Sequence, residues 1–256
     1  MRGKQFRELV LYNVICTLKA ESSRYALSYF WWIIEPALHF FILFFVFGIF
    51  FNGNKNGDFI PFLFCGVIPW FWFNKSISNG MESIIKGSNI IRDTYIPKYF
   101  FPIVSVISDA FKELLVFIIL IIVLLLSGFY PSKMWLFLPL VLLLELLLIT
   151  TIVSLVAILV PYLHDIKHAI NSGLQILMFS TGTFYDYRTM PERFHIFYDW
   201  NPTVLLINMF RDILMYNKAI NVNDYMYILV FVFCFGIISY FANRVLDKDV
   251  PKVLFR

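Results

Sequence analysis

The chain has 256 residues, of which 60% are hydrophobic, 20% aromatic and only 15% charged, with a net charge of +4. A soluble globular domain carries about 25% charged residues, so this composition excludes a soluble enzyme domain, a disordered chain and a secreted disulfide scaffold. It predicts an all-α integral membrane protein. Its three cysteines are odd in number and lie in or beside apolar runs, which favours free thiols.

The first 27 residues are expected to form a cytoplasmic amphipathic helix that lies in the membrane interface. Its apolar positions recur at helical spacing, at Phe6, Leu9, Val10, Val14 and Leu18. No signal peptide is visible. The alternative is a plain basic flank that only fixes the topology.

Six apolar blocks then follow in residues 28–256, separated by Gly, Pro and Asn breakers. A bilayer core about 30 Å thick needs about 20 helical residues. The fifth block is the shortest and carries several polar residues. The expected spans are 28–51, 59–83, 102–127, 135–161, 168–185 and 224–245.

Lysine and arginine set the expected orientation. With both termini in the cytoplasm, thirteen basic residues fall in inner segments and six in outer ones, while Lys75 and Lys112 lie within spans. Basic residues concentrate on the cytoplasmic side of membrane proteins. The bias therefore predicts six spans with cytoplasmic N- and C-termini.

A short inner link joins the second and third spans, with the sequence GSNIIRDTYIPK over residues 87–98. Gly87 and Pro97 bracket eight or nine residues that favour a short helix. Such a helix, stiffly attached to two spans, can transmit force from a docked partner; the alternative is an ordinary link. The candidate coupling residues here are Ser88, Asn89, Ile90, Ile91, Arg92, Asp93 and Tyr95.

The outer segment 186–223 is too long for a tight turn and too apolar for a solvated loop. Pro191 and the Asn201-Pro202 pair cut it into pieces, and Thr203 is expected to cap a helix. We expect a pair of short re-entrant or interfacial helices. Because such pieces survive in lipid only where their ends face protein or water, they suggest a gate. The alternative is an anchor on the lipid surface.

Tests for enzymatic chemistry are negative. Gly48 and Gly53 have phosphate-loop spacing, but Asn54 stands where lysine is required. His164 and His168 are four residues apart without an obvious third ligand. The sequence therefore predicts no catalytic residue, no metal site and no cofactor bound by this chain.

Ionisable residues inside apolar blocks are costly and are functional candidates by default. Glu35 lies near the inner end of the first span. Asp109, Lys112 and Glu113 share one helical face of the third span, where the lysine can neutralise either carboxylate. Glu145 stands alone among leucines; it is either a proton carrier or a carboxyl that is protonated or hydrogen-bonded to a neighbouring helix.

Aromatic residues are unusually frequent, with 30 Phe, 14 Tyr and 6 Trp. Phe30, Trp31 and Trp32 lie together at the inner end of the first span. Aromatic faces can stack on sugar rings, although lipid contact or core packing accounts for most of these side chains.

Several stretches, in order, resemble the polysaccharide and polyol-phosphate export permeases of the type-2 ABC exporter class. Residues 22–36 (SSRYALSYFWWIIEP) resemble the family's entry signature, and residues 90–102 resemble its cytoplasmic coupling segment with paired prolines. Residues 163–166 (LHDI) resemble an RDI motif with His in place of Arg. Residues 190–212, with MPE, WNP and FRD, resemble its outer segment.

This resemblance implies the membrane subunit of an exporter in the bacterial inner membrane. Two copies would form the pore, and two copies of a separate ATPase would bind ATP and Mg on the inner side. Six helices are also too few to enclose a channel for a glycan, which favours a homodimer. The cargo would be a lipid-linked polysaccharide such as O-antigen, capsule or teichoic acid, and no nucleic acid is involved.

The resemblance also suggests roles for particular residues. His164 and Asp165 would join the coupling residues. A substrate entry path would use Arg24, Phe30, Trp31, Trp32, Glu35 and His39. The outer gate would use Tyr185, Tyr187, Pro191, Glu192, Trp200, Asn201, Pro202 and Arg211.

Other functional classes remain open at this point. A small-molecule or drug exporter of the same ABC class would share this architecture. A proton-coupled secondary transporter would use Glu145 and Asp109 and would need no ATPase. A membrane enzyme or a non-transporting scaffold has no catalytic constellation in its favour.

Overall fold

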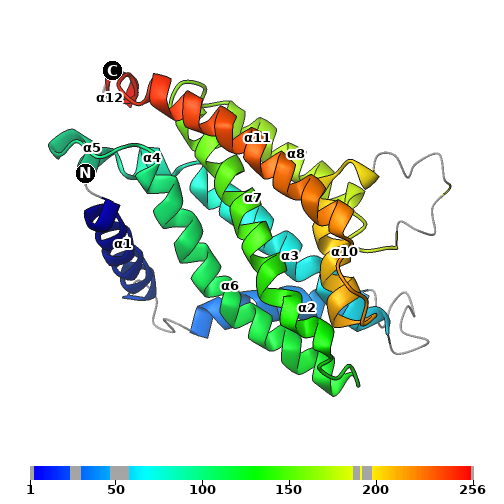
Figure 1. Ribbon diagram of the computed structural model, residues 1–256. Coiled ribbons are helices and arrows are strands. Elements are labelled where there is room, and N and C mark those ends of the chain that lie inside the picture. Colours follow the sequence, from blue (N-terminus) through cyan, green and yellow to red (C-terminus); the bar gives the residue numbers. More distant parts are fainter. Residues whose placement is uncertain (1–2, 24–29, 47–57, 187–190, 192–197, 255–256) are drawn as a thin grey trace.

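The computed structural model describes residues 3–23, 30–46, 58–186, 191 and 198–254, and within these residues all regular structure is helical. The expectation of an all-α fold is therefore confirmed. Figure 1 shows long, roughly antiparallel helices with shorter ones at both ends. The helices are α1 (Gly3–Ser23), α2 (Trp31–Leu43), α3 (Phe59–Gly80), α4 (Ser83–Lys86), α5 (Ser88–Asp93), α6 (Phe100–Leu126), the 3-10 helix η3 (Lys133–Phe137), α7 (Leu138–Leu159), α8 (Ile166–Ser180), α10 (Pro202–Leu214), α11 (Val222–Leu246) and α12 (Val250–Leu254).

Three of the described helical segments are long and apolar enough to cross a membrane: Phe59–Gly80, Lys133–Leu159 and Val222–Leu246. α6 has 27 residues, but three ionisable side chains interrupt its apolar composition. α8 has 15 residues and is about 22 Å long, which is less than the hydrocarbon thickness. The chain is thus a multi-pass membrane protein, and the count of six spans stays a prediction.

The main hydrophobic core is built around α3, which contacts α6, α7 and α10. Most side chains of α3 are buried, because neighbouring helices cover nearly all of its faces. Helices α3 and α7 approach each other closely at Gly80, because glycine has no Cβ. An added Cβ there would fall 2.2 Å from a methyl group of Val153 on α7. α11 packs along the other side of α7 and leaves most of its own surface exposed.

A second hydrophobic cluster joins α1, the start of α6 and α12. Val10 and Val14 of α1 are buried, whereas Leu11, Tyr12 and Ile15 are exposed on its other side. The exposed surface of α1 also carries the charged Lys4, Arg7, Glu8 and Lys19, and its position in the membrane interface stays a prediction. Figure 1 shows α5, α12 and the described start of α1 gathered at one end, and α10 toward the other. We name these the inner and outer ends after the predicted orientation, which stays a prediction.

Candidate functional site

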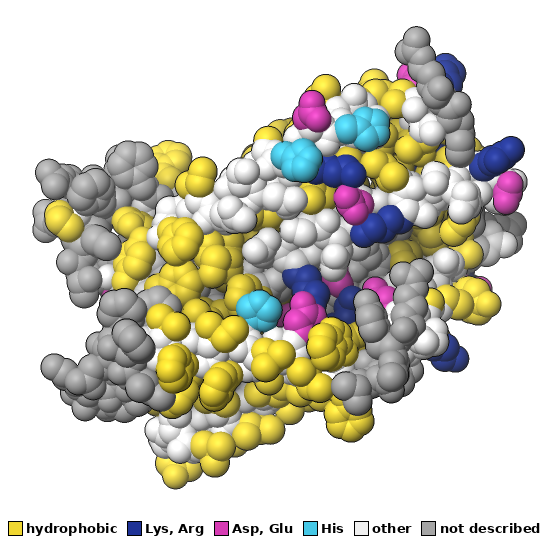
Figure 2. Space-filling view, turned by 180° about the vertical axis from the view of Figure 1, so that it is seen from behind, with side chains coloured by type: hydrophobic (Ala, Val, Ile, Leu, Met, Phe, Trp, Pro, Cys, Tyr) yellow, Lys and Arg dark blue, Asp and Glu magenta, His cyan; other side chains and the backbone are white. Residues whose placement is uncertain are grey.

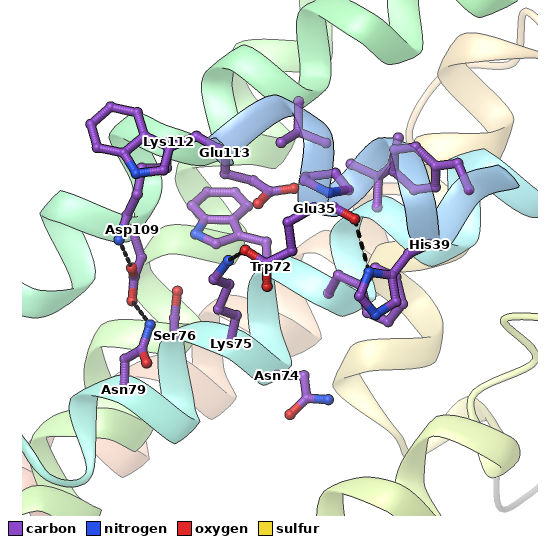
Figure 3. Close-up of a pocket in the computed structure, with 16 residues that line it drawn as sticks. Glu35, His39, Trp72, Asn74, Lys75, Ser76, Asn79, Asp109, Lys112 and Glu113 are labelled. Atoms are coloured by element: carbon purple, nitrogen blue, oxygen red, sulfur yellow. Dashed lines mark hydrogen bonds and ion pairs between the residues drawn. The ribbon is translucent and has the colours of Figure 1, made fainter. Parts of the chain in front are cut away.

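A pocket of about 400 Å³ lies between α2, α3 and α6. Polar and charged side chains line it, although all three helices are mainly apolar (Figure 3). The helical spacing of α3 turns Lys75, Ser76 and Asn79 toward this side of the bundle. The pocket is lined by Trp32, Glu35, Pro36, His39, Phe40, Ile68, Phe71, Trp72, Asn74, Lys75, Ser76, Asn79, Asp109, Lys112, Glu113 and Val116.

Two ion-paired groups form its walls. Lys75 Nζ of α3 lies 2.9 Å from Glu35 Oε2 of α2. Lys112 Nζ of α6 lies 2.7 Å from Asp109 Oδ1 and 3.0 Å from Glu21 Oε2 of α1. The Lys75–Glu35 pair ties α2 to α3, and the Lys112–Glu21 pair ties α1 to α6, whereas Lys112 and Asp109 both belong to α6.

Asn79 extends the second group into α3, since its amide nitrogen donates to Asp109 Oδ2 over 3.1 Å. The structure thus places Lys112 beside Asp109, one of the two carboxylates expected from helical spacing. The partners Glu21 and Asn79 were missed, because nothing in the local sequence pattern indicates contacts over long chain separations. Glu113 lines the same pocket without joining either ion-paired group.

Three buried polar atoms of pocket residues have no hydrogen-bond partner among the described residues. They are Nε1 of Trp72, Oγ of Ser76 and Oε1 of Glu113. Leaving a buried polar group unsatisfied costs about 1–3 kcal/mol. The pocket wall therefore carries hydrogen-bonding groups that its ion pairs and its other described residues leave without partners.

The predicted entry residues divide into two groups. Trp32, Glu35 and His39 line the pocket, and His39 Nδ1 lies 2.9 Å from the carbonyl oxygen of Glu35. Phe30 and Trp31 are exposed and do not line it. Arg24 lies outside the described residues.

Figure 2 views the molecule from behind the view of Figure 1. On this face, charged and histidine side chains surround a hollow that lies between more apolar parts of the surface. Ser78 Oγ of α3 donates to Asn171 Oδ1 of α8 over 3.4 Å. α8 also exposes Ser172 and Gln175. The polar Asn171 of the predicted fifth span therefore lies next to the polar face of α3.

At the inner end, the predicted coupling segment forms the six-residue helix α5, shorter than the eight or nine residues expected. Its backbone turns extended at Thr94, which ends the helix. Ile91 is buried and anchors α5. Side chains that stay exposed or partly exposed here are Ser88, Asn89, Ile90, Arg92, Asp93 and Tyr95.

A contact with the C-terminal region, which sequence reasoning missed, holds this segment. Asp247 accepts hydrogen bonds from the Tyr95 hydroxyl and the backbone N–H of Lys98, each at 2.8 Å. The bond to this carboxylate raises the pKa of Tyr95. Val250 of α12 is fully buried in the cluster that includes Ile91. Asp247 and Val250 thus position the predicted coupling segment.

His164 and Asp165 are exposed in the turn between α7 and α8. Close by in sequence, Lys167 Nζ lies 3.0 Å from Glu82 Oε1 in the turn that precedes α4. This hydrogen bond lowers the pKa of the Glu82 carboxyl. The start of α8 is therefore linked to the α4–α5 region.

At the outer end, Arg211 of α10 is buried, with 3% of its surface exposed. Its guanidinium donates to the carbonyl oxygens of Phe62, Gly182 and Thr183 at 3.4, 2.9 and 2.8 Å. It also lies 3.6 Å from the centre of the Phe62 ring. An added Cβ at Gly66 would fall 2.5 Å from this guanidinium. Arg211 thus fastens α10 to α3 and to the turn after α8.

The N-terminus of α10 corrects one expectation. Asn201, not Thr203, caps the helix, since its side chain accepts from the Thr203 N–H at 3.1 Å. Pro202 occupies the first turn, where a missing N–H costs nothing. The sequence predicts a pair of short helices in this outer segment. In the described part of 186–223, α10 is the one longer helix.

Of the other predicted gate residues, Asn201 and Pro202 begin α10, and Tyr185 contacts Tyr198 shortly before it. The Tyr185 hydroxyl donates to the Phe179 carbonyl over 2.8 Å and lies 3.0 Å from the Tyr198 hydroxyl. Trp200 and Pro191 are exposed. Tyr187 and Glu192 lie outside the described residues.

Two further results concern chemistry. Glu145 of α7 is buried, and its Oε2 finds no hydrogen-bond partner in the described part of the chain. It lines a small cavity with Trp70 and Thr203, separate from the pocket. No group of three or more His, Cys, Asp or Glu residues is placed to hold a metal ion where the structure describes the chain.

Comparison with known proteins identifies the architecture. The chain is 25% identical over 239 residues to the O-antigen export system permease protein RfbA of Klebsiella pneumoniae, covering 92% of this chain and 90% of that protein. It is 28% identical over 205 residues to the polysialic acid transport protein KpsM of Escherichia coli, covering 77% and 78%. The model of the ABC-2 type transporter family matches residues 12–215. The chain therefore belongs to the ABC-2 type transporter family.

Proposed function

We propose that this chain is the membrane subunit of an ATP-driven exporter that moves a lipid-linked polysaccharide out of the cytoplasm. The observation that carries the proposal is similarity along 92% of the chain to an O-antigen export permease. The polar pocket among apolar helices supports it, because polar groups in a membrane are costly and mark substrate paths.

The energy comes from a separate ATPase that docks on the inner end. α5 offers it a rigid, partly exposed surface, since Ile91 and the Asp247 contacts hold the segment from behind. His164 and Asp165 add an exposed turn nearby. Movement of α5 passes directly into α6 through residues 94–99.

Movement of α6 also reaches α1 and α3. Lys112 bonds to Glu21 of α1, and Asp109 accepts from Asn79 of α3. A shift of α6 therefore displaces the walls of the pocket together with the interface helix. These ionic contacts are the proposed route from ATP hydrolysis to the substrate.

The path itself forms between two copies of the chain. One copy leaves the polar face of α8 and much of α2 uncovered, and closed two-fold pairing is the usual solution for such a surface. The glycan enters on the inner side near residues 24–39 and passes the hollow beside α3. Segment 186–212, fastened through Arg211, closes the outer mouth.

The test is uncoupling of ATP hydrolysis from export in vesicles that contain the chain and its ATPase. Arg92→Ala removes an exposed charge from α5, and Asp247→Ala removes the acceptor that positions the segment. We expect both to lower export severalfold while the ATPase still copurifies. Lys218→Ala, an exposed charge at the outer end, is the matched control. Normal export in both variants would remove the coupling role of α5.

A small-molecule exporter of the same class makes a different prediction. It would show drug-stimulated ATP hydrolysis and no stimulation by lipid-linked glycan. Stimulation by the glycan alone supports the proposal.

A further inference from the structure

We propose that the pocket between α2, α3 and α6 binds a single uncharged sugar unit of the exported glycan. This inference rests on the proposed function and adds the charge class of the substrate. The pocket volume of about 400 Å³ lies in the range of small-molecule sites and is too small for a chain of many units.

The unfilled hydrogen-bonding groups identify the ligand chemistry. Trp72 carries an N–H donor, Glu113 a carboxyl oxygen, and Ser76 a hydroxyl that does both; these atoms are buried in the pocket wall without partners among the described residues, so a ligand reaches them through small side-chain shifts. Buried polar groups of native proteins are normally paired. Each hydroxyl of a sugar donates one hydrogen bond and accepts others, so neighbouring hydroxyls on one ring satisfy both kinds of group.

Aromatic side chains complete a sugar-binding surface. Trp32 and Phe71 line the same pocket as Trp72. Aromatic rings offer flat apolar faces, and a tryptophan adds a polar N–H at its edge. This combination suits a ligand with an apolar ring face and a polar rim.

The charges argue against an anionic ligand. The pocket holds the carboxyls of Glu35, Asp109 and Glu113 but only two ammonium groups, and both of these are already ion-paired. A carboxylate or phosphate on the ligand would have to displace a wall residue from its lysine. Breaking such a pair leaves an uncompensated charge, which is strongly unfavourable.

The test measures binding to the complex of the chain and its ATPase in lipid nanodiscs. Tryptophan fluorescence reports the pocket, because Trp32 and Trp72 line it. The probes are a neutral mannose oligosaccharide and an oligosialic acid of equal length. We expect saturable binding of the neutral probe and binding of the acidic probe that is weaker by about tenfold or more.

Matched variants assign the binding to the pocket. Ser76→Ala and Glu113→Leu should each weaken neutral binding by about fivefold or more. Ser83→Ala and Glu145→Leu remove a buried hydroxyl and carboxyl that also lack partners in the described residues but lie outside the pocket. These two controls should bind as the unaltered chain does, and thermal unfolding confirms that all four fold.

Two results overturn the pocket and leave the proposed function standing. One is glycan export that continues while neither probe binds. The other is binding that ignores Ser76→Ala and Glu113→Leu, or that favours the acidic probe. In contrast, failure of any lipid-linked glycan to stimulate ATP hydrolysis or cross the vesicle membrane overturns the proposed function itself.

Discussion

The outer junction at Arg211 and the inner pocket both place charged groups among apolar helices, but their hydrogen bonding differs. Arg211 donates to three carbonyl oxygens from two separate segments. In the pocket, Trp72, Ser76 and Glu113 keep polar atoms that nothing in the described chain satisfies. A satisfied buried charge holds a structure together, whereas unpartnered polar groups in the wall of a cavity add nothing to its stability and support the proposed binding of a ligand.

This contrast predicts opposite effects on stability, and the largest concerns Arg211. Arg211→Met removes the donor to three carbonyl oxygens, of which those of Gly182 and Thr183 are in buried hydrogen bonds, so we expect a loss of about 3 kcal/mol or more in the free energy of unfolding. Thermal unfolding in detergent measures it, with Arg244→Met, an exposed arginine, as the control. Equal melting temperatures for the two variants would contradict a structural role for Arg211.

Gly66→Ala tests the same junction from α3. Its Cβ would lie 2.5 Å from the guanidinium nitrogen and 2.9 Å from the Thr183 carbonyl oxygen, so the guanidinium must move. We expect a loss of about 1–3 kcal/mol. Gly173→Ala, whose Cβ meets nothing within 4 Å, should cost nothing. Unchanged stability of Gly66→Ala would contradict a close contact between Gly66 and the Arg211 guanidinium.

The sequence predicts those parts of this comparison that depend on local spacing. Helical periodicity places Asp109 next to Lys112, and composition identifies the apolar helices. It does not predict the partners Glu21 and Asn79, which lie 91 and 30 residues from the residues they bond. The sequence also does not predict the carbonyl partners of Arg211, because every residue type carries the same backbone carbonyl acceptor.

The cap of α10 shows how local rules compete. Asn201 and Thr203 are both good capping residues. Pro202 decides between them, since proline favours the first helical position and so puts the cap one residue earlier. The prediction of Thr203 overlooked this constraint.

Glu113→Leu sharpens the comparison at the pocket. Replacing an unsatisfied buried carboxyl by an apolar side chain of similar size removes a desolvation penalty. We therefore expect unchanged or higher stability, within about 1 kcal/mol, in the same thermal assay. A loss as large as that of Arg211→Met would mean that Glu113 is already bonded and the pocket is complete.

The smallest effect belongs to Glu82, which pairs with Lys167 near the surface. Glu82→Gln should cost at most about 1 kcal/mol. Because the folded-state pKa of Glu82 lies below its ordinary value of 4.5, the pair stabilises the chain above that pH and stops doing so as pH falls through the lowered pKa. Melting curves of the two proteins should therefore converge in acid; a constant difference would contradict the pairing.

The most direct test of the account is transport by vesicles that contain the purified chain with or without its ATPase. We predict that lipid-linked glycan crosses only when both proteins and ATP are present, and that Glu145→Gln leaves transport unchanged. Transport by the chain alone, driven by a proton gradient and abolished in Glu145→Gln, would contradict the account.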